Sequence, residues 1–176
     1  MRQYKIGIVG PESTGKSALA LALAQHYKTE FVPEMARVYL ENLGRDYDYP
    51  DLKKIAQLQM QKELELGNAN ELLICDTSLL VLKIWSEFKY NKVDAYIDQE
   101  ESSNRYDLYL LTNIDLPWEN DPLREHPNDR AFLFDLYHNA LIEKKCTYEI
   151  VTGNGPTRLW NACKLIDHHF NLLTNS

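Results

Sequence analysis

Residues 10–17 read GPESTGKS, and they follow the short apolar run YKIGIV at residues 4–9. The octet fits the pattern G-x-x-x-x-G-K-[ST], whose glycines let the backbone wrap closely and turn its N–H groups toward an anion. An apolar run before the octet and helix-forming residues after it are the context in which this pattern holds nucleotide phosphates. We therefore predict a phosphate-binding loop rather than a glycine-bounded surface turn, made of Gly10, Pro11, Glu12, Ser13, Thr14, Gly15, Lys16, Ser17 and Ala18.

Three side chains near this loop have the chemistry to act on a bound nucleotide. Lys16 is placed to reach the β- and γ-phosphates, and the Ser17 hydroxyl is a ligand type that suits Mg²⁺. Asp76 ends the apolar run ELLICD at 71–76, where an acid holds Mg²⁺ directly or through water. The alternative role for Asp76 is to cap the next helix along the chain.

The rest of the chain alternates between strand-like and helix-like segments. Further strands are expected at 30–33, 71–76, 107–112 and 147–153, and helices at 15–27, 34–44, 51–67, 78–88, 92–102, 131–144 and 156–170. This βαβα order predicts an α/β fold, a P-loop kinase-like three-layer αβα arrangement with a five-stranded parallel sheet. Such sheets bind ligands beyond the carboxyl ends of their strands, where the motifs of this chain fall.

Composition narrows the class of protein. The chain has 176 residues, which suits a single domain over 1–176, with 44% apolar residues and a net charge of −7. An acidic protein repels phosphate backbones, so we expect no nucleic-acid partner. We expect no membrane span or signal peptide and a cytoplasmic location. Cys75, Cys146 and Cys163 lack metal-ligand spacing and are expected to be free thiols, buried as small hydrophobes.

The residues after the fourth expected strand help to distinguish a GTPase, a motor and a small-molecule kinase. A GTPase would carry Asn-Lys-x-Asp there, but this chain continues with NIDLPW. A motor needs coupling elements for which this length leaves little room. A small-molecule kinase needs an acid near the acceptor hydroxyl, cations over the transferred phosphoryl group and a cover that excludes water.

Candidates for these three parts are present. Glu34, in FVPEMAR, is expected to accept or orient the proton of a substrate hydroxyl, although the helix dipole alone also favours an acid there. Arg37 lies one helical turn on and either binds substrate or pairs with Glu34 at the surface. Residues 115–130 carry prolines, Arg124 and Arg130, and predict a lid that places guanidinium groups on developing charge. The alternative is a solvated loop whose arginines pair with nearby acids.

Five segments together resemble the ribosylnicotinamide kinase domain of NadR-type NAD-salvage proteins, over about residues 4–160: GPESTGKS, VPEMARVYLE, ICDTSLLVLKIWSE, RYDLYLLTNIDLPWENDPLRE and VTGNGPTR. That family uses ATP and Mg²⁺ to phosphorylate the ribose 5′-hydroxyl of nicotinamide riboside. The resemblance implies that Glu34 and Arg37 lie at the nucleoside site, and Asp76 near Mg²⁺ and the acceptor ribose. It also implies that Asn154 and Arg158 lie near the adenine, although Arg158 also fits a helix-surface cation.

Trp85 and Trp118 are the candidates for stacking on a flat cationic ring such as nicotinamide, although a core position is the commoner fate of a tryptophan. No H-x-G-H spacing occurs among the histidines, and no DNA-binding helical domain is evident, so we expect kinase activity alone. The open alternatives are an ATP-binding regulatory or ATPase module and a kinase for another alcohol or nucleoside. Residue spacing does not choose between Glu34 and Asp76 as the base, and it carries no signal for an oligomeric state.

Overall fold

The computed structural model describes residues 3–67, 70–103 and 106–171. Its strands form one parallel sheet in the order β2-β3-β1-β4-β5. They are β1 (Tyr4–Val9), β2 (Phe31–Val32), β3 (Leu72–Asp76), β4 (Leu108–Thr112) and β5 (Tyr148–Val151). The expected five-stranded parallel sheet is confirmed. The strand that leads into the phosphate loop lies at its centre, where Ile6 pairs with Ile74 on one side and Leu108 on the other.

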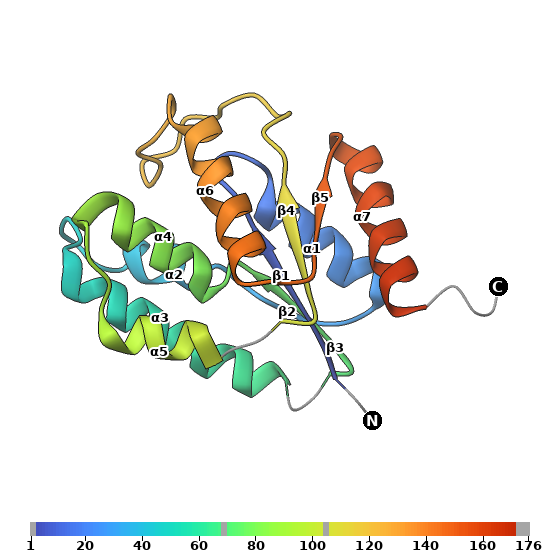
Figure 1. The fold of residues 1–176 in the computed structure, drawn as a ribbon, viewed down its shortest axis with the longest axis horizontal. Coiled ribbons are helices and arrows are strands. Elements are labelled where there is room, and N and C mark those ends of the chain that lie inside the picture. The colour runs from blue at the N-terminus through green and yellow to red at the C-terminus, as the bar shows by residue number, and fades with distance from the viewer. Residues whose placement is uncertain (1–2, 68–69, 104–105, 172–176) are drawn as a thin grey trace.

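Helices cover both faces of the sheet, as Figure 1 shows. The helices are α1 (Lys16–Tyr27), α2 (Met35–Glu41), α3 (Tyr49–Gly67), α4 (Leu79–Tyr90), α5 (Ala95–Ser103), α6 (Arg130–Glu143) and α7 (Gly155–Phe170). One core cluster joins the sheet to α1 and α7, and another joins its opposite face to α4 and α6. A third cluster packs α2, α3, α4 and α5 together. The three-layer αβα arrangement is therefore confirmed.

The central strands are apolar on both faces because both faces are covered. In β1, Ile8 belongs to the cluster with α1 and α7, whereas the next residue, Val9, belongs to the cluster with α4 and α6. Leu110 and Leu111 divide in the same way in β4. This alternation specifies the register, because a slip by one residue would exchange the two faces.

The expected element boundaries hold to within a few residues, with one instructive difference. The helix expected from Asp51 begins earlier, at Tyr49. The fully buried Asp51 carboxylate accepts a hydrogen bond from the Asp48 backbone N–H at 3.0 Å, and Arg45 and Tyr39 also donate to it. The carboxylate thus accepts a backbone hydrogen bond just before the helix, and the first turn can form around Pro50.

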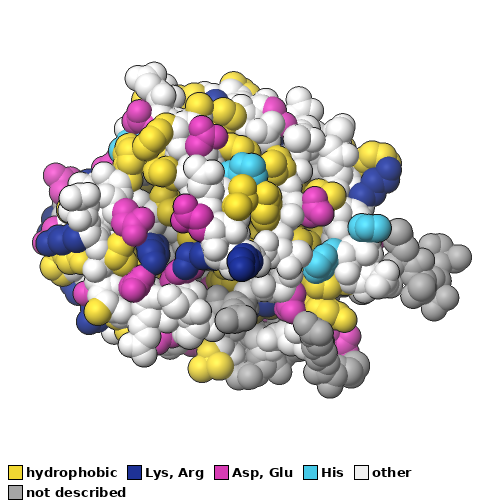
Figure 2. Space-filling model, viewed as in Figure 1, with side chains coloured by type: hydrophobic (Ala, Val, Ile, Leu, Met, Phe, Trp, Pro, Cys, Tyr) yellow, Lys and Arg dark blue, Asp and Glu magenta, His cyan; other side chains and the backbone are white. Residues whose placement is uncertain are grey.

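The carboxyl ends of β1, β3 and β4 meet at one edge of the sheet, and the long segment between β4 and α6 crosses above it (Figure 1). The expected free thiols are confirmed: Cys75 and Cys163 are buried, and Cys146 is partly buried. Within the described residues, no helix combines the length and apolar character needed to cross a membrane. Figure 2 shows acidic and basic side chains interspersed over one face of the molecule.

Gly10 gives a direct test of how tightly the phosphate loop joins the sheet. It has φ +142°, and a Cβ there would lie 2.4 Å from Thr112 Oγ1. We expect Gly10→Ala to lower the free energy of unfolding by about 2–4 kcal/mol in denaturant titrations, because backbone strain adds to a clash in a closed space. The matched control is Gly44→Ala, at φ +69° with no atom within 4 Å of the added Cβ. The control should cost only about 1 kcal/mol, and equal losses in both variants would contradict this account.

Candidate active site

The phosphate loop is fastened to the end of β4 by two buried hydroxyl groups. Thr14 Oγ1 lies 2.7 Å from Thr112 Oγ1 and donates to the Pro11 carbonyl at 2.7 Å. Thr112 Oγ1 also lies 3.2 Å from the Val9 carbonyl, and its single hydrogen is shared between that carbonyl and Thr14 Oγ1. Both threonine side chains are fully buried, so their hydroxyls depend on each other and on the loop for partners. Sequence reasoning did not single out Thr112, although it ends its strand as Asp76 ends β3.

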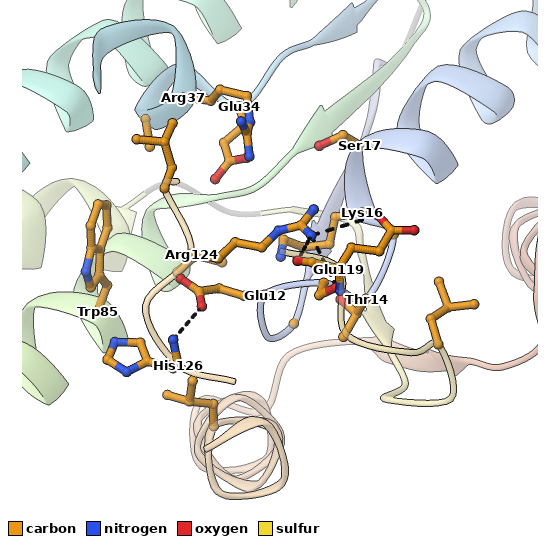
Figure 3. A pocket seen from close by; sticks show the side chains of 18 of the residues that line it. Glu12, Thr14, Lys16, Ser17, Glu34, Arg37, Trp85, Glu119, Arg124 and His126 are labelled. Carbon is orange, nitrogen blue, oxygen red and sulfur yellow. Dashed lines mark hydrogen bonds and ion pairs between the residues drawn. The ribbon is translucent and has the colours of Figure 1, made fainter. Parts of the chain in front are cut away.

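A cavity of about 320 Å³ opens beside this loop. The loop supplies one wall, from Gly10 to Ala18 without Pro11, and α2, α4, α6 and the segment after β4 supply the others. In Figure 3, Lys16 and Ser17 lie at one end and Trp85 at the other. Lys16 Nζ donates to the Pro11 carbonyl at 2.8 Å, which holds the ammonium group over the loop. The predicted loop residues thus surround one concave space suited to phosphate.

Ser17 and Asp76 are brought together as the sequence predicts. The Asp76 carboxyl is 1% exposed, and its Oδ1 has no hydrogen-bond partner among the described residues. Burial, and next the charge of Glu34, raise the pKa of Asp76 from 3.8 to about 6, while a hydrogen bond with Ser17 opposes them. A buried oxygen without a partner beside a serine hydroxyl fits a hard cation such as Mg²⁺. Ser17 and Asp76 are therefore the residues that would hold it.

The two residues after Asp76 extend this polar site in a way that the sequence did not signal. Thr77 and Ser78 are buried, and neither side-chain oxygen has a hydrogen-bond partner within the described chain. Thr77 also has φ +85°, a rare conformation for a β-branched residue. Ser78 occupies the N-cap position of α4 but makes no side-chain capping bond. Helix capping therefore does not account for this Asp-Thr-Ser run, which leaves three buried oxygens for another partner.

Glu34 and Arg37 both line the cavity, at the start of α2. Arg37 Nη2 donates to Asp121 in the segment after β4 at 2.9 Å, whereas its Nε lies 4.0 Å from Glu34. The main partner of Arg37 is therefore the predicted lid rather than its neighbour in the helix. Glu34 keeps a partly exposed carboxylate facing the cavity (Figure 3).

The predicted lid, residues 115–130, covers the phosphate loop through specific bonds. Ser13 Oγ accepts from the Glu119 N–H at 2.8 Å, and Arg124 donates to the same hydroxyl at 3.3 Å. Arg124 lines the cavity, but Arg130 does not. Arg130 donates instead to the carbonyl groups of Ser13 and Leu116. Of the two predicted arginines, only Arg124 lines the cavity beside the phosphate loop.

Apolar and aromatic side chains from the helices also line the cavity. They are Trp85 and Phe88 of α4, Leu40 of α2, and Leu133 and Tyr137 of α6. His126, which sequence reasoning did not single out, packs its ring edge-on against Phe88 and lies near Trp85 in Figure 3. Trp118 does not line the cavity, and its indole donates to Asn120 within the lid. Of the two tryptophans, the structure brings only Trp85 into the site.

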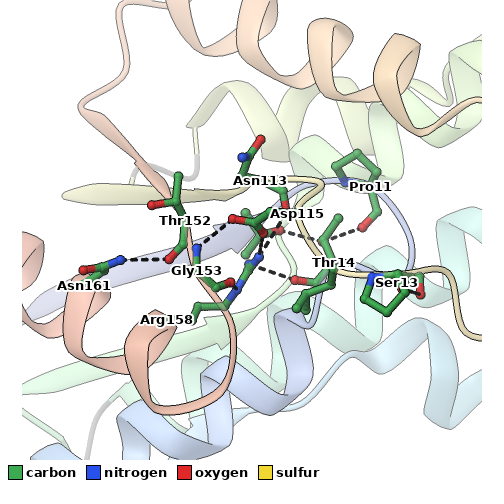
Figure 4. Close-up of polar contacts among 12 residues, drawn as sticks. Pro11, Ser13, Thr14, Asn113, Asp115, Thr152, Gly153, Arg158 and Asn161 are labelled. Carbon is green, nitrogen blue, oxygen red and sulfur yellow. Dashed lines mark hydrogen bonds and ion pairs between the residues drawn. The ribbon is translucent and has the colours of Figure 1, made fainter.

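Arg158 is buried rather than placed on the helix surface, and Figure 4 shows its polar contacts. It donates to the carbonyls of Gly153 at 2.7 Å and Thr14 at 2.9 Å, and it forms an ion pair with Asp115. The side chain therefore ties the turn after β5 to the phosphate loop. The helix-surface alternative is wrong, because the α7 N-terminus packs against that loop. Asn154 is exposed at the N-cap of α7.

Comparison with known proteins agrees with this geometry. The family profile described as "AAA domain" matches residues 5–158, and no curated protein sequence matches the chain. Two NadR crystal structures, one with NAD and AMP-PNP and one with NR, are 19% and 18% identical to the chain, with TM-scores of 0.76 and 0.81. Each covers 99% of this chain, which spans about half of theirs, 51% and 53%.

Thymidylate kinase from Ehrlichia chaffeensis is also similar, with 12% identity, a TM-score of 0.66 and coverage of 96% of this chain and 98% of its own. At these identities the likeness concerns the fold, and it confirms the expected P-loop kinase-like fold of the NadR type.

The raised pKa of Asp76 makes a prediction about stability and pH. Because the folded pKa of about 6 exceeds 3.8, ionising Asp76 costs stability above about pH 6, and that cost vanishes below about pH 4. Without Mg²⁺ or nucleotide, Asp76→Asn should raise the free energy of unfolding by about 2–3 kcal/mol at pH 7.5 and by much less at pH 4. The control Asp135→Asn, at an exposed position, should change it by less than about 0.5 kcal/mol. A less stable Asp76→Asn protein at pH 7.5 would contradict this reading.

Arg158→Lys should destabilise the fold although it keeps the charge. Lysine cannot reproduce the fork that reaches Gly153, Thr14 and Asp115 together. We expect a loss of about 2–4 kcal/mol in the free energy of unfolding, measured by denaturant titration. The control Lys164→Arg, at an exposed position on α7, should change it by less than about 0.5 kcal/mol. Tolerance of Arg158→Lys at that level would show that the buried network is unimportant.

Proposed function

The chain belongs to the AAA-domain family, and from that premise we propose that it is an ATP-dependent small-molecule kinase. Its proposed reaction is phosphorylation of the ribose 5′-hydroxyl of a nucleoside, with nicotinamide riboside as the first candidate. The observation that carries the proposal is a single cavity with two different ends. Phosphate-binding groups surround one end, and an aromatic wall lined by Trp85 closes the other. A hydrolytic switch has no need of a second compartment beside its phosphate loop, whereas a kinase must hold an acceptor there.

The donor end would stabilise the charge of the transferred phosphoryl group. Lys16 stands over the phosphate loop, and Arg124 extends over the same region from the lid (Figure 3). Positive groups fixed before the reaction stabilise developing charge without reorganising water. Ser17 and Asp76 would hold Mg²⁺, which when bound neutralises phosphate charge. The lid bonds to Ser13 keep water away from the donor phosphate, which limits transfer to water.

The acceptor end would bind the nucleoside with its ribose toward Glu34. The Glu34 carboxylate faces the cavity, so it can accept a hydrogen bond from a substrate hydroxyl and orient it. Asp76 is almost fully buried and does not line the cavity, which favours Glu34 over Asp76 as the group that contacts the hydroxyl. The flat face of Trp85 suits a heterocyclic ring.

Nicotinamide riboside is the first candidate because the motifs of this chain resemble the NadR-type kinase domain, and one similar NadR structure contains NR. The chain spans about half of those NadR chains, so the proposal concerns the kinase step alone. A kinase for a different nucleoside is the second candidate, since a deoxyadenosine kinase from M. mycoides shares the fold, at 18% identity and a TM-score of 0.62.

The proposal is tested by ADP release and product mass with a panel of nucleosides, nicotinamide riboside included, and shikimate as a non-nucleoside alcohol. We expect nicotinamide riboside to raise ADP release well above the rate with ATP alone and to gain one phosphate. Lys16→Ala should lower kcat at least about 100-fold while the protein stays folded. Lys164→Ala, at an exposed position on α7, is the matched control and should keep full activity. If no panel member raises ADP release, the kinase proposal is wrong.

A further inference from the structure

Glu125 lies in the lid and bonds both to the phosphate loop and to residues beside Trp85. Its backbone N–H donates to the Glu12 carboxylate of the phosphate loop, at 3.0 and 3.2 Å to the two oxygens. The next residue, His126, donates its own N–H to the same carboxylate at 3.0 Å. The Glu125 carboxylate points the other way and accepts from Tyr47 at 2.8 Å and from Lys89 at 2.9 Å. One lid residue therefore joins the donor loop to the acceptor side.

Tyr47 links this carboxylate to the aromatic wall. It lies in the segment between α2 and α3, and its hydroxyl accepts from Trp85 Nε1 at 3.0 Å while donating to Glu125. The two rings meet edge to face, with centroids 4.9 Å apart. Because Trp85 lines the cavity, a ring bound against it would touch a side chain whose orientation Tyr47 holds. The path from acceptor to phosphate loop thus runs through Trp85, Tyr47, Glu125 and Glu12.

The charges along this path fix the direction of each hydrogen bond. Burial, and next the neighbouring Glu125 carboxylate, raise the pKa of Tyr47, so its hydroxyl stays protonated and can donate. Burial also works to raise the pKa of Glu125, but the hydrogen bonds from Lys89 and Tyr47 outweigh it and lower that pKa. Glu125 is therefore ionised at neutral pH and accepts from both partners. Hydrogen bonds to a charged acceptor are the stronger kind, so this contact holds the lid in a defined position.

We propose that Tyr47 is a positioning residue that couples acceptor binding to closure of the lid over the phosphate loop. An acceptor ring against Trp85 stabilises the indole orientation in which Tyr47 and Glu125 are bonded. Glu125 then presents its N–H, with that of His126, to Glu12. By reciprocity, a nucleotide that stabilises the closed lid favours acceptor binding. This inference rests on the proposed kinase function and adds to it a residue that controls acceptor affinity and the fraction of ATP lost to water.

Tyr47→Phe removes the hydroxyl and keeps the ring beneath Lys89 and beside Trp85. The KM for the nucleoside should rise about tenfold, because the hydroxyl loses its hydrogen bond to Glu125 and those that it accepts from Trp85 and Lys89. The KM for ATP should stay within about twofold, and the yield of phosphorylated nucleoside per ADP should fall. The control is Tyr49→Phe, since Tyr49 packs on Tyr90 beneath Lys92 and makes no hydroxyl hydrogen bond within the described residues. A Tyr47→Phe enzyme with unchanged nucleoside KM and unchanged yield overturns the proposal.

A double-mutant cycle distinguishes positioning from a merely structural role. If Tyr47 acts through Glu125, Tyr47→Phe should add less than about twofold to the nucleoside KM in a Glu125→Ala background. Full addition of the two effects would show that they are independent and would overturn the proposal. Glu125→Gln keeps an acceptor for the Tyr47 hydroxyl and should restore part of the affinity lost in Glu125→Ala.

A measurement without turnover separates this inference from the proposed function. Amide hydrogen exchange of lid peptides covering Glu125 and His126, with AMP-PNP bound, should be about threefold faster in Tyr47→Phe than in the wild type and unchanged in Tyr49→Phe. If no nucleoside is phosphorylated but exchange rises, the proposed function fails while the link between Tyr47 and the lid stands. If phosphorylation occurs but exchange and nucleoside KM are both unchanged, the link fails and the kinase stands.

Discussion

The phosphate loop can turn its N–H groups toward an anion only if the carbonyl groups that face the other way find donors. In this protein those donors are cationic side chains and one hydroxyl group. The carbonyl–donor pairs are Pro11 with Lys16 and Thr14, Ser13 with Arg130, and Thr14 with Arg158. An unpaired buried carbonyl would cost free energy comparable to a lost hydrogen bond. The shape of the loop therefore depends on the lid and on α7, which supply two of these donors from distant parts of the chain.

This requirement divides the arginines between two tasks. Arg130 and Arg158 are engaged by backbone carbonyls of the loop and its neighbours, so they maintain its geometry. Arg124 donates to the Glu119 carbonyl within the lid and to the Ser13 hydroxyl, but it also lines the cavity, so it is the arginine that the proposed phosphoryl transfer would use. Arginine suits both tasks because its planar fork binds several oxygens at once. Positive charge near a nucleotide is thus a poor guide to catalysis until the partners of each guanidinium are known.

The residues at the end of β3 lower the stability of the fold, and packing alone does not explain why they are there. Asp76, Thr77 and Ser78 place polar atoms in a buried space without hydrogen-bond partners among the described residues, and Thr77 adopts a strained backbone conformation. Strain and unpaired polar groups persist where the surrounding structure holds them in place, and they gather at functional sites. The apolar packing of Ile74, Leu79 and Leu80 on either side provides that support. The arrangement is the kind expected where a protein holds a ligand at the expense of stability.

The sequence determines the order of strands and helices and the phosphate loop, because both rest on local pattern. It also determines that Ser17 meets Asp76, because parallel strands end at one edge of the sheet. Local pattern could not decide which arginine enters the cavity, that Trp118 stays outside it, or that Arg37 binds Asp121 and Tyr47 binds Glu125. These outcomes join residues far apart in the chain. Their partners depend on how the lid lies across α2 and α4, which is decided by packing of the whole structure and by the need of each buried polar group for a partner.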